Sequence, residues 1–196
     1  MEPKIYRYVI TADDGMAPCI DQGLLTLATC KPVIRRCAQI EDWVVAFFGV
    51  NDEVGELVWA GKVAKKLEIG EYQRRYSDRS DAVYKEVAPH KFEALRRDYH
   101  SDRAQQKRDF FNPALIFAQS STWYFGRESR EVPLSLQHLI PKGQGHRVNN
   151  RRKGDLDRLI AWLHSVHTPG IHGEPKHSWA CGGCETLPSK TSCVSC

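Results

Sequence analysis

The stretch from Tyr8 to Gly49, YVITADDGMAPCIDQGLLTLATCKPVIRRCAQIEDWVVAFFG, decides the fold class of this 196-residue chain. It places a β-rich segment, an acidic turn, a short basic helix and a continuous apolar strand in close succession. Because the apolar segments must enter the core, the polar residues between them are expected at its edge. We therefore predict that this stretch forms both a wall of the core and a functional site.

Hydrophobic patterning around this stretch predicts an α+β protein. Residues 5–11 are rich in β-formers, and the apolar run 43–48 has the length of a strand that is buried on both faces. Between them we expect a helix from Pro32 to about Ala38, with Thr29 as its N-terminal cap.

The remainder of the chain alternates apolar and charged segments. The polar tip 49–55 leads into a second apolar run, which predicts a hairpin with a bulge or a close backbone approach at Gly61. The charged stretch 71–109 is expected to be a long surface excursion with some helix and no core of its own. Residues 113–126 return to strand-like composition, and residues 155–166 have the pattern of an amphipathic helix.

The tryptophans and their neighbours are expected to be mainly core residues. Trp43 and Trp59 lie in predicted strands. Trp123 and Tyr124 occupy adjacent strand positions, so they must face opposite sides of the sheet and only one of them can line a given pocket.

Charge and composition limit the classes of function. The formal net charge is +4, which is less basic than a strong nucleic-acid binder, so any polynucleotide contact must come from clustered charge. No apolar run approaches 18 residues, so no membrane span is expected. The beginning of the sequence lacks the apolar region of a signal peptide, and we expect a cytoplasmic protein.

Four motifs, in order, carry a resemblance to a known family. The block within residues 8–45 is followed by the run Asp81–Tyr84 (DAVY), by Trp123–Gly126 (WYFG) and by Lys142–Arg147 (KGQGHR). Together they resemble the nucleotide-modification-associated domain of the second type, over about residues 4–165. That family is found with base-modification systems, which implies a role in nucleotide modification.

The arrangement also resembles, more distantly, PUA-like barrels such as the ASCH and EVE domains. This likeness implies a PUA-like mixed β-barrel with flanking helices, which binds RNA or modified bases. Some ASCH members hydrolyse modified nucleosides with a lysine and a threonine, which implies such roles for Lys31 and Thr26. The chain departs from the closer family at Ala82, where asparagine is usual, and at Glu41, where glycine is usual.

The leading hypothesis is a binding module that recognises a modified base, a nucleotide or a nucleic acid in a modification or defence system. Lys31 and Arg35 lie one helical turn apart and would suit a phosphate or a base edge, unless they form a solvated helix face. Of Asp13 and Asp14, one is expected to cap the turn and the other to contact a base. The predicted ligand-binding residues are Asp13, Asp14, Lys31, Arg35, Tyr84, Tyr124, Gly145, His146 and Arg147.

A second hypothesis is a hydrolase or base-modifying enzyme that acts on a modified nucleoside. The loop 142–153 joins glycines such as Gly145, which permit a close approach to phosphate, to several basic side chains. Lys31 would be the base or nucleophile, Thr26 its partner and His146 the proton donor. The alternative for His146 is a structural histidine.

The end of the chain carries the metal signal. Two C-x-x-C pairs separated by eight residues predict a structural zinc ion; the expected ligands are Cys181, Cys184, Cys193 and Cys196. The expected division is a domain at 1–166, a linker at 167–178 and a zinc-knuckle-like tail at 179–196. His172 and His177 are substitute ligands, and the alternatives are a disordered tail with oxidisable thiols or an adaptor that docks a protein partner.

Overall fold

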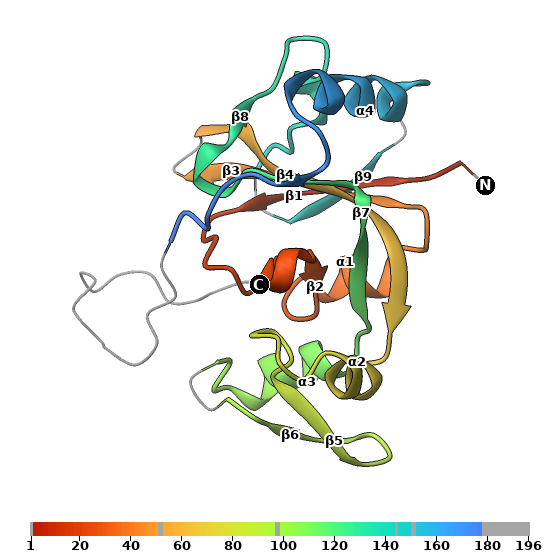
Figure 1. Cartoon of the computed structure of the whole chain (residues 1–196), viewed down its shortest axis with the longest axis vertical. Helices are drawn as coiled ribbons and strands as arrows, with labels where there is room; N and C mark the ends of the chain where they lie inside the picture. The colour runs from red at the N-terminus through yellow and green to blue at the C-terminus, as the bar shows by residue number, and fades with distance from the viewer. Residues whose placement is uncertain (1, 51–52, 97–98, 144, 150–151, 178–196) are drawn as a thin grey trace.

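The computed structural model describes residues 2–177, apart from residues 51–52, 97–98, 144 and 150–151. Strands and helices are interspersed along this part of the chain (Figure 1). The strands are β1 (Ile5–Ile10), β2 (Thr26–Leu27), β3 (Trp43–Val50), β4 (Glu53–Leu67), β5 (Tyr84–Ala88), β6 (Lys91–Ala94), β7 (Ala114–Tyr124), β8 (Arg130–Glu131), β9 (His146–Asn149) and β10 (Gly170–Ile171). The helices are α1 (Pro32–Cys37), α2 (Ile69–Arg75), α3 (Arg103–Phe110) and α4 (Asp155–Val166), with 3-10 turns η1 (Asp21–Gly23), η2 (Gly126–Glu128) and η3 (Gln137–Leu139).

A mixed sheet forms the centre of the molecule. Its order is β10-β7-β4-β3-β1-β9, with β2 added to β7 and β8 added to β4. The pairs β1–β3 and β10–β7 are parallel, and the other pairs are antiparallel. The sheet curls into a half-barrel, which confirms the α+β class (Figure 1). The PUA-like assignment stays a prediction.

The two faces of the sheet carry separate cores because successive strand residues point to opposite sides. One face, here the α1 face, packs residues such as Tyr8, Trp59 and Tyr124 against α1 and β2. The other, the α4 face, packs Trp43 and Trp123 against α4. Trp123 and Tyr124 therefore face opposite sides, as predicted, and Trp43 and Trp59 are core residues.

The hairpin predicted around residues 49–55 is confirmed, since β3 and β4 pair antiparallel. The expected irregularity at Gly61 is also present, because the register between β4 and β7 shifts just after it. A Cβ atom at Gly61 would lie 3.0 Å from Phe117 Cδ1 and 3.2 Å from Thr122 Oγ1. The missing side chain lets β7 pack closely there.

The charged stretch 71–109 differs most from expectation, because it does have a core. It contributes most of α2, the β5–β6 hairpin and α3, which lie beyond α1 and β2 in Figure 1. Tyr72, Tyr84 and Tyr99 pack there with Met16 and other apolar residues. Aromatic residues spaced among charges bury enough surface to fold this segment, so the prediction of a coreless excursion was wrong.

The turn before α1 also differs from expectation. Lys31, rather than Thr29, is the N-terminal cap of the helix. Cys30 and Lys31 have φ angles of 53° and 44°, so two successive residues are left-handed and the chain reverses sharply after β2. The Thr29 hydroxyl is instead bonded to the Met16 carbonyl, 3.3 Å away.

The stretch expected as a linker, 167–178, adds one short strand, residues 170–171, to the sheet. It contains β10, and the backbone N–H of His172 donates to the Tyr124 carbonyl at 2.8 Å. The predicted zinc tail at 179–196 lies outside the described residues. None of the helices in the described part of the chain is long and apolar enough to cross a membrane.

Candidate functional site

A buried carboxylate marks the α1 face of the sheet. Asp13 lies in the loop after β1 and is 1% exposed. Its Oδ2 accepts a hydrogen bond from the Tyr124 hydroxyl at 2.7 Å, whereas no donor among the described residues bonds to its Oδ1. Its backbone N–H donates to His177 Nδ1 at 3.1 Å, and its carbonyl accepts from the His177 N–H at 2.8 Å. The last described residues therefore hold this carboxylate in place.

Burial is the main influence on the pKa values of Asp13 and Tyr124. It raises the pKa of Asp13, although the Tyr124 hydroxyl and the nearby Lys176 backbone N–H both lower it. Burial and the neighbouring carboxylate raise the pKa of Tyr124 as well, so its hydroxyl stays a hydrogen-bond donor. Buried polar atoms in proteins are nearly always hydrogen-bonded. Asp13 Oδ1 is an exception, because no donor in the described part of the chain hydrogen-bonds to it.

Two basic residues predicted for the site, Lys31 and His146, lie on the same face of the sheet. Lys31 Nζ is 5.0 Å from the centre of the Tyr8 ring, a cation–π contact. His146 is directly opposite Tyr8 in the antiparallel β1–β9 pair, so the two side chains share a face. The Tyr8 hydroxyl accepts from Trp59 Nε1 at 3.2 Å. The early basic turn and the late histidine loop thus meet around Tyr8.

Asp14 has a different environment from Asp13. Its Oδ1 accepts from the Met16 backbone N–H at 3.1 Å, which is the bonding of a turn residue. It also lines an open cavity of about 450 Å³ between the loop 14–16, η1 and residues 171–175. Asp21, Glu174 and Arg96 line the same cavity, which is therefore more acidic than basic.

Arg35 and Tyr84 contact Asp109 rather than the Lys31–Tyr8 pair. Arg35 is 0% exposed, and its guanidinium donates to the Cys30, Asp109, Asn112 and Pro113 carbonyls and to the Asp109 carboxylate. The Tyr84 hydroxyl donates to Asp109 Oδ2 at 3.0 Å. The Arg35 guanidinium and the Tyr84 hydroxyl thus donate to buried protein groups. Contrary to expectation, Arg35 therefore does not share a ligand-binding helix face with Lys31.

Thr26 is part of a second internal network. Its hydroxyl donates to Asp81 Oδ2 at 2.6 Å and accepts from Arg79 at 2.7 Å, with the Tyr72 hydroxyl beside it. Burial raises the pKa of Asp81, against the lowering effect of Arg79. No hydrogen bond joins Thr26 to Lys31, both of which are described residues. The predicted catalytic pair of Lys31 and Thr26 is therefore not assembled in this structure.

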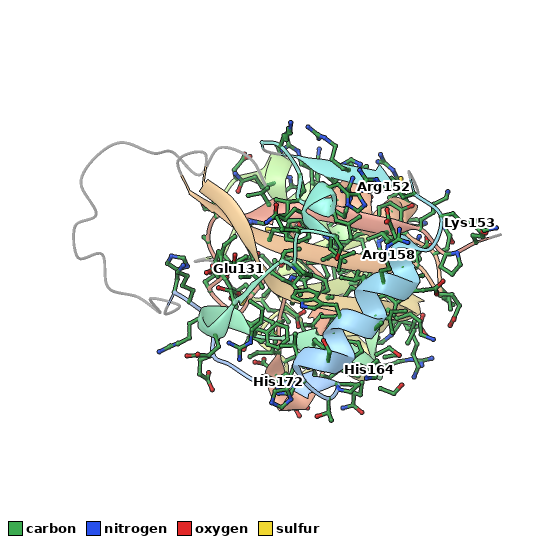
Figure 2. All side chains as sticks on the ribbon, turned by 90° about the horizontal axis from the view of Figure 1, so that it is seen from above. Glu131, Arg152, Lys153, Arg158, His164 and His172 are labelled. Atoms are coloured by element: carbon green, nitrogen blue, oxygen red, sulfur yellow. The ribbon has the colours of Figure 1, made fainter. Side chains whose placement is uncertain are left out.

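The basic residues of the 142–153 loop divide between the two faces. Arg147 pairs with Arg7, whose side chain bonds to the Leu139 carbonyl under the α4 face, so Arg147 lies on that side. Gly145 is exposed. Figure 2 shows Arg152, Lys153 and Arg158 near the N-terminal end of α4. Among the described residues of this loop, His146 alone is placed by its register beside Tyr8.

Sequence reasoning missed the cluster next to Cys30. His100 and Asp109 lie within bonding distance of it although they are 70 and 79 residues away in the chain. Both come from the stretch that was expected to be a surface excursion. No short spacing in the sequence signals such a contact.

The curled sheet, the buried carboxylate and the basic groups around Tyr8 describe an α+β domain with a polar site on one sheet face. The family model described as nucleotide modification associated domain 2 matches residues 2–182. The chain belongs to this family, which confirms the resemblance carried by the sequence motifs. Neither a curated protein nor a solved structure matches this chain.

Proposed function

We propose that this chain binds a nucleobase, free or in a nucleotide or nucleic acid, through Asp13 on the α1 face of the sheet. The observation that carries the proposal is the buried Asp13 Oδ1, to which no donor in the described chain bonds. An acceptor held in this way suits the amino or ring N–H groups that bases present on their edges. Membership in a family associated with nucleotide modification supports this class of ligand.

The neighbouring groups fit the rest of such a ligand. Lys31 lies over the Tyr8 ring and supplies positive charge for a phosphate, and His146 is opposite Tyr8 in the neighbouring strand. The cavity beside Asp14 carries the carboxylates of Asp21 and Glu174, which would repel a phosphate. The proposed orientation therefore directs the base toward Asp13 and the phosphate toward Lys31.

Replacing Asp13 by asparagine tests the proposal. Asp13→Asn keeps an acceptor for the Tyr124 hydroxyl but replaces the free carboxylate oxygen with an amide, and we expect about tenfold or greater loss of affinity for the preferred ligand. The measurement is a titration of nucleosides and nucleoside monophosphates against the tryptophan fluorescence of the protein, to which Trp59 beside Tyr8 contributes, with calorimetry to confirm it.

Asp14→Asn is the matched control, because Asp14 is the adjacent carboxylate and serves the turn. It is expected to change affinity less than threefold. The proposal would be contradicted if Asp13→Asn and Asp14→Asn lost affinity equally, or if no base-containing ligand bound saturably.

The same substitution should stabilise the protein at neutral pH. Because the pKa of Asp13 is raised above the ordinary 3.8, the native state holds its proton to higher pH than the unfolded chain does. Stability due to this group is therefore lost as pH rises through the native pKa. We expect Asp13→Asn to raise the melting temperature by about 2–4 °C at pH 7 and to have little effect below pH 4. A lower melting temperature at pH 7 would show that the carboxylate is structural.

A zinc ion in the tail is a separate proposal from the two C-x-x-C pairs. We expect about one zinc per chain by elemental mass spectrometry of the full protein, and a loss of this zinc in the double variant Cys181→Ser/Cys184→Ser. Cys37→Ser is the control, since Cys37 is an exposed thiol in the described domain. Zinc that is absent, or that survives the double substitution, would remove this proposal and the adaptor role built on it.

A further inference from the structure

A thiol, an imidazole and a carboxylate meet beside the β2–α1 turn, apart from the Asp13 contacts. Cys30 Sγ lies 3.6 Å from His100 Nε2, and His100 Nδ1 lies 2.6 Å from Asp109 Oδ2. This order and these contacts are those of a cysteine–histidine–aspartate relay. Asp109 is buried, while the side chain of His100 is 15% exposed and Cys30 is 6% exposed. The histidine and the thiol thus lie nearest to solvent, as a relay requires.

Asp109 fixes the geometry of the other two residues. Its Oδ1 accepts from the backbone N–H of Cys30 at 2.7 Å and from Arg35 at 3.2 Å. Its Oδ2 accepts from the Tyr84 hydroxyl as well as from His100. A histidine that donates from Nδ1 to a carboxylate presents the lone pair of Nε2 to its other neighbour. The Cys30 thiol is such a neighbour of Nε2, and it also lies 3.4 Å from the Tyr99 hydroxyl.

The backbone is strained at both reactive residues. Cys30 has a φ of 53° and His100 a φ of 47°. Left-handed residues other than glycine are strained and concentrate at functional sites. Cys30 also sits on a tight turn between strand β2 and helix α1, which is the local setting of the nucleophile in many hydrolases. A simple structural hydrogen bond needs neither feature.

A metal site explains this cluster less well than a catalytic relay does. Among the described residues, no group of three histidine, cysteine or acidic side chains has the arrangement to hold one. The three residues are instead connected in series, with the histidine between the thiol and the carboxylate.

We propose that Cys30 is the nucleophile of an acyl-transfer activity, His100 its general base and Asp109 the positioning residue. The Cys30 thiol gives its proton to His100 Nε2 while the sulfur bonds to the carbonyl carbon of an ester or amide. The bond from that carbon to the leaving oxygen or nitrogen then breaks, and the leaving atom takes the proton from His100. Water attacks the thioester with His100 again accepting a proton, which releases the acid and restores the thiol.

Alkylation of Cys30 by iodoacetamide tests the relay on the full reduced protein. The rate at each cysteine is followed by peptide mass mapping from about pH 5 to pH 9, with exposed Cys37 as the internal reference. We expect Cys30 to react about tenfold faster than Cys37 near pH 6, because a histidine-paired thiol is ionised well below the ordinary pKa of about 8.5. p-Nitrophenyl acetate is the second probe and should transfer its acetyl group to Cys30.

In His100→Gln and His100→Ala, Cys30 should be alkylated no faster than Cys37 near pH 6. The midpoint of its alkylation profile should move toward about pH 8.5. His90→Ala is the control, because His90 is exposed and also left-handed, with a φ of 59°; it should leave the profile unchanged. Cys30 labelling no faster than Cys37 near pH 6, or an unchanged profile in a folded His100→Gln protein, would overturn the proposal.

Discussion

Arg35→Met should destabilise the protein by about 3–5 kcal/mol, one of the two largest losses that we expect from a single substitution. The guanidinium is fully buried and forms an ion pair with Asp109, 3.2 Å from Oδ1. Methionine fills much of the same volume but leaves the Asp109 carboxylate buried without its charge partner. Several carbonyls between α3 and β7, including that of Asn112 at 2.5 Å, also lose their donor. Arg35 thus connects α1 to the segment that ends the stretch 71–109.

Urea unfolding of Arg35→Met and Arg36→Met measures this loss. Arg36 is the next residue and is exposed, so its substitution should cost less than about 0.5 kcal/mol. In the double variant with Asp109→Asn, the losses should be less than additive because both changes remove the same ion pair. An Arg35→Met protein as stable as Arg36→Met would mean that the guanidinium is not buried as described.

Gly126→Ala should cost about 3 kcal/mol or more and should also weaken ligand binding. Gly126 has a φ of 55°, and a Cβ atom there would overlap the carbonyl oxygen of Glu174 and lie 3.0 Å from Tyr124 Cε1. Backbone atoms cannot move aside as a flexible side chain can, so the segment around Glu174 must shift. That segment continues to His177, which is bonded to the backbone of Asp13.

Gly143→Ala separates the clash from backbone strain. Gly143 is also left-handed, with a φ of 79°, but a Cβ atom there meets nothing within 4 Å. Its substitution should cost only about 1 kcal/mol, the strain of a left-handed alanine. If the free energies of unfolding of the two alanine variants differ by less than about 1 kcal/mol, the packing of residues 171–177 against β7 is not what holds Asp13 in place.

The sequence was sufficient for elements whose signal is local. The apolar run at 43–48 became β3, and the alternation across Trp123 and Tyr124 assigned them to opposite faces, because neighbouring residues alone determine such patterns. The core formed by the charged stretch 71–109 could not be predicted in the same way. Its aromatic residues, such as Tyr72 and Tyr99, are scattered among charges, and they meet only after the chain has folded back.

The site was predictable only in part for the same reason. The acidic turn after β1 and the basic residue before Pro32 were visible as polar breaks in apolar sequence. Their partners were not, since Asp13 bonds to a residue 164 positions away. The guanidinium of Arg35 was misjudged because sequence does not reveal that Asp109 neutralises it within the core.

The most direct test of the account is a crystal structure of the protein with its tightest-binding nucleoside or nucleotide. We expect a base N–H group at hydrogen-bond distance, about 2.7–3.2 Å, from Asp13 Oδ1, while the Tyr124 hydroxyl keeps its bond to Oδ2. A base bound elsewhere on the protein, with Asp13 Oδ1 still bonded to no ligand atom, would contradict the central claim.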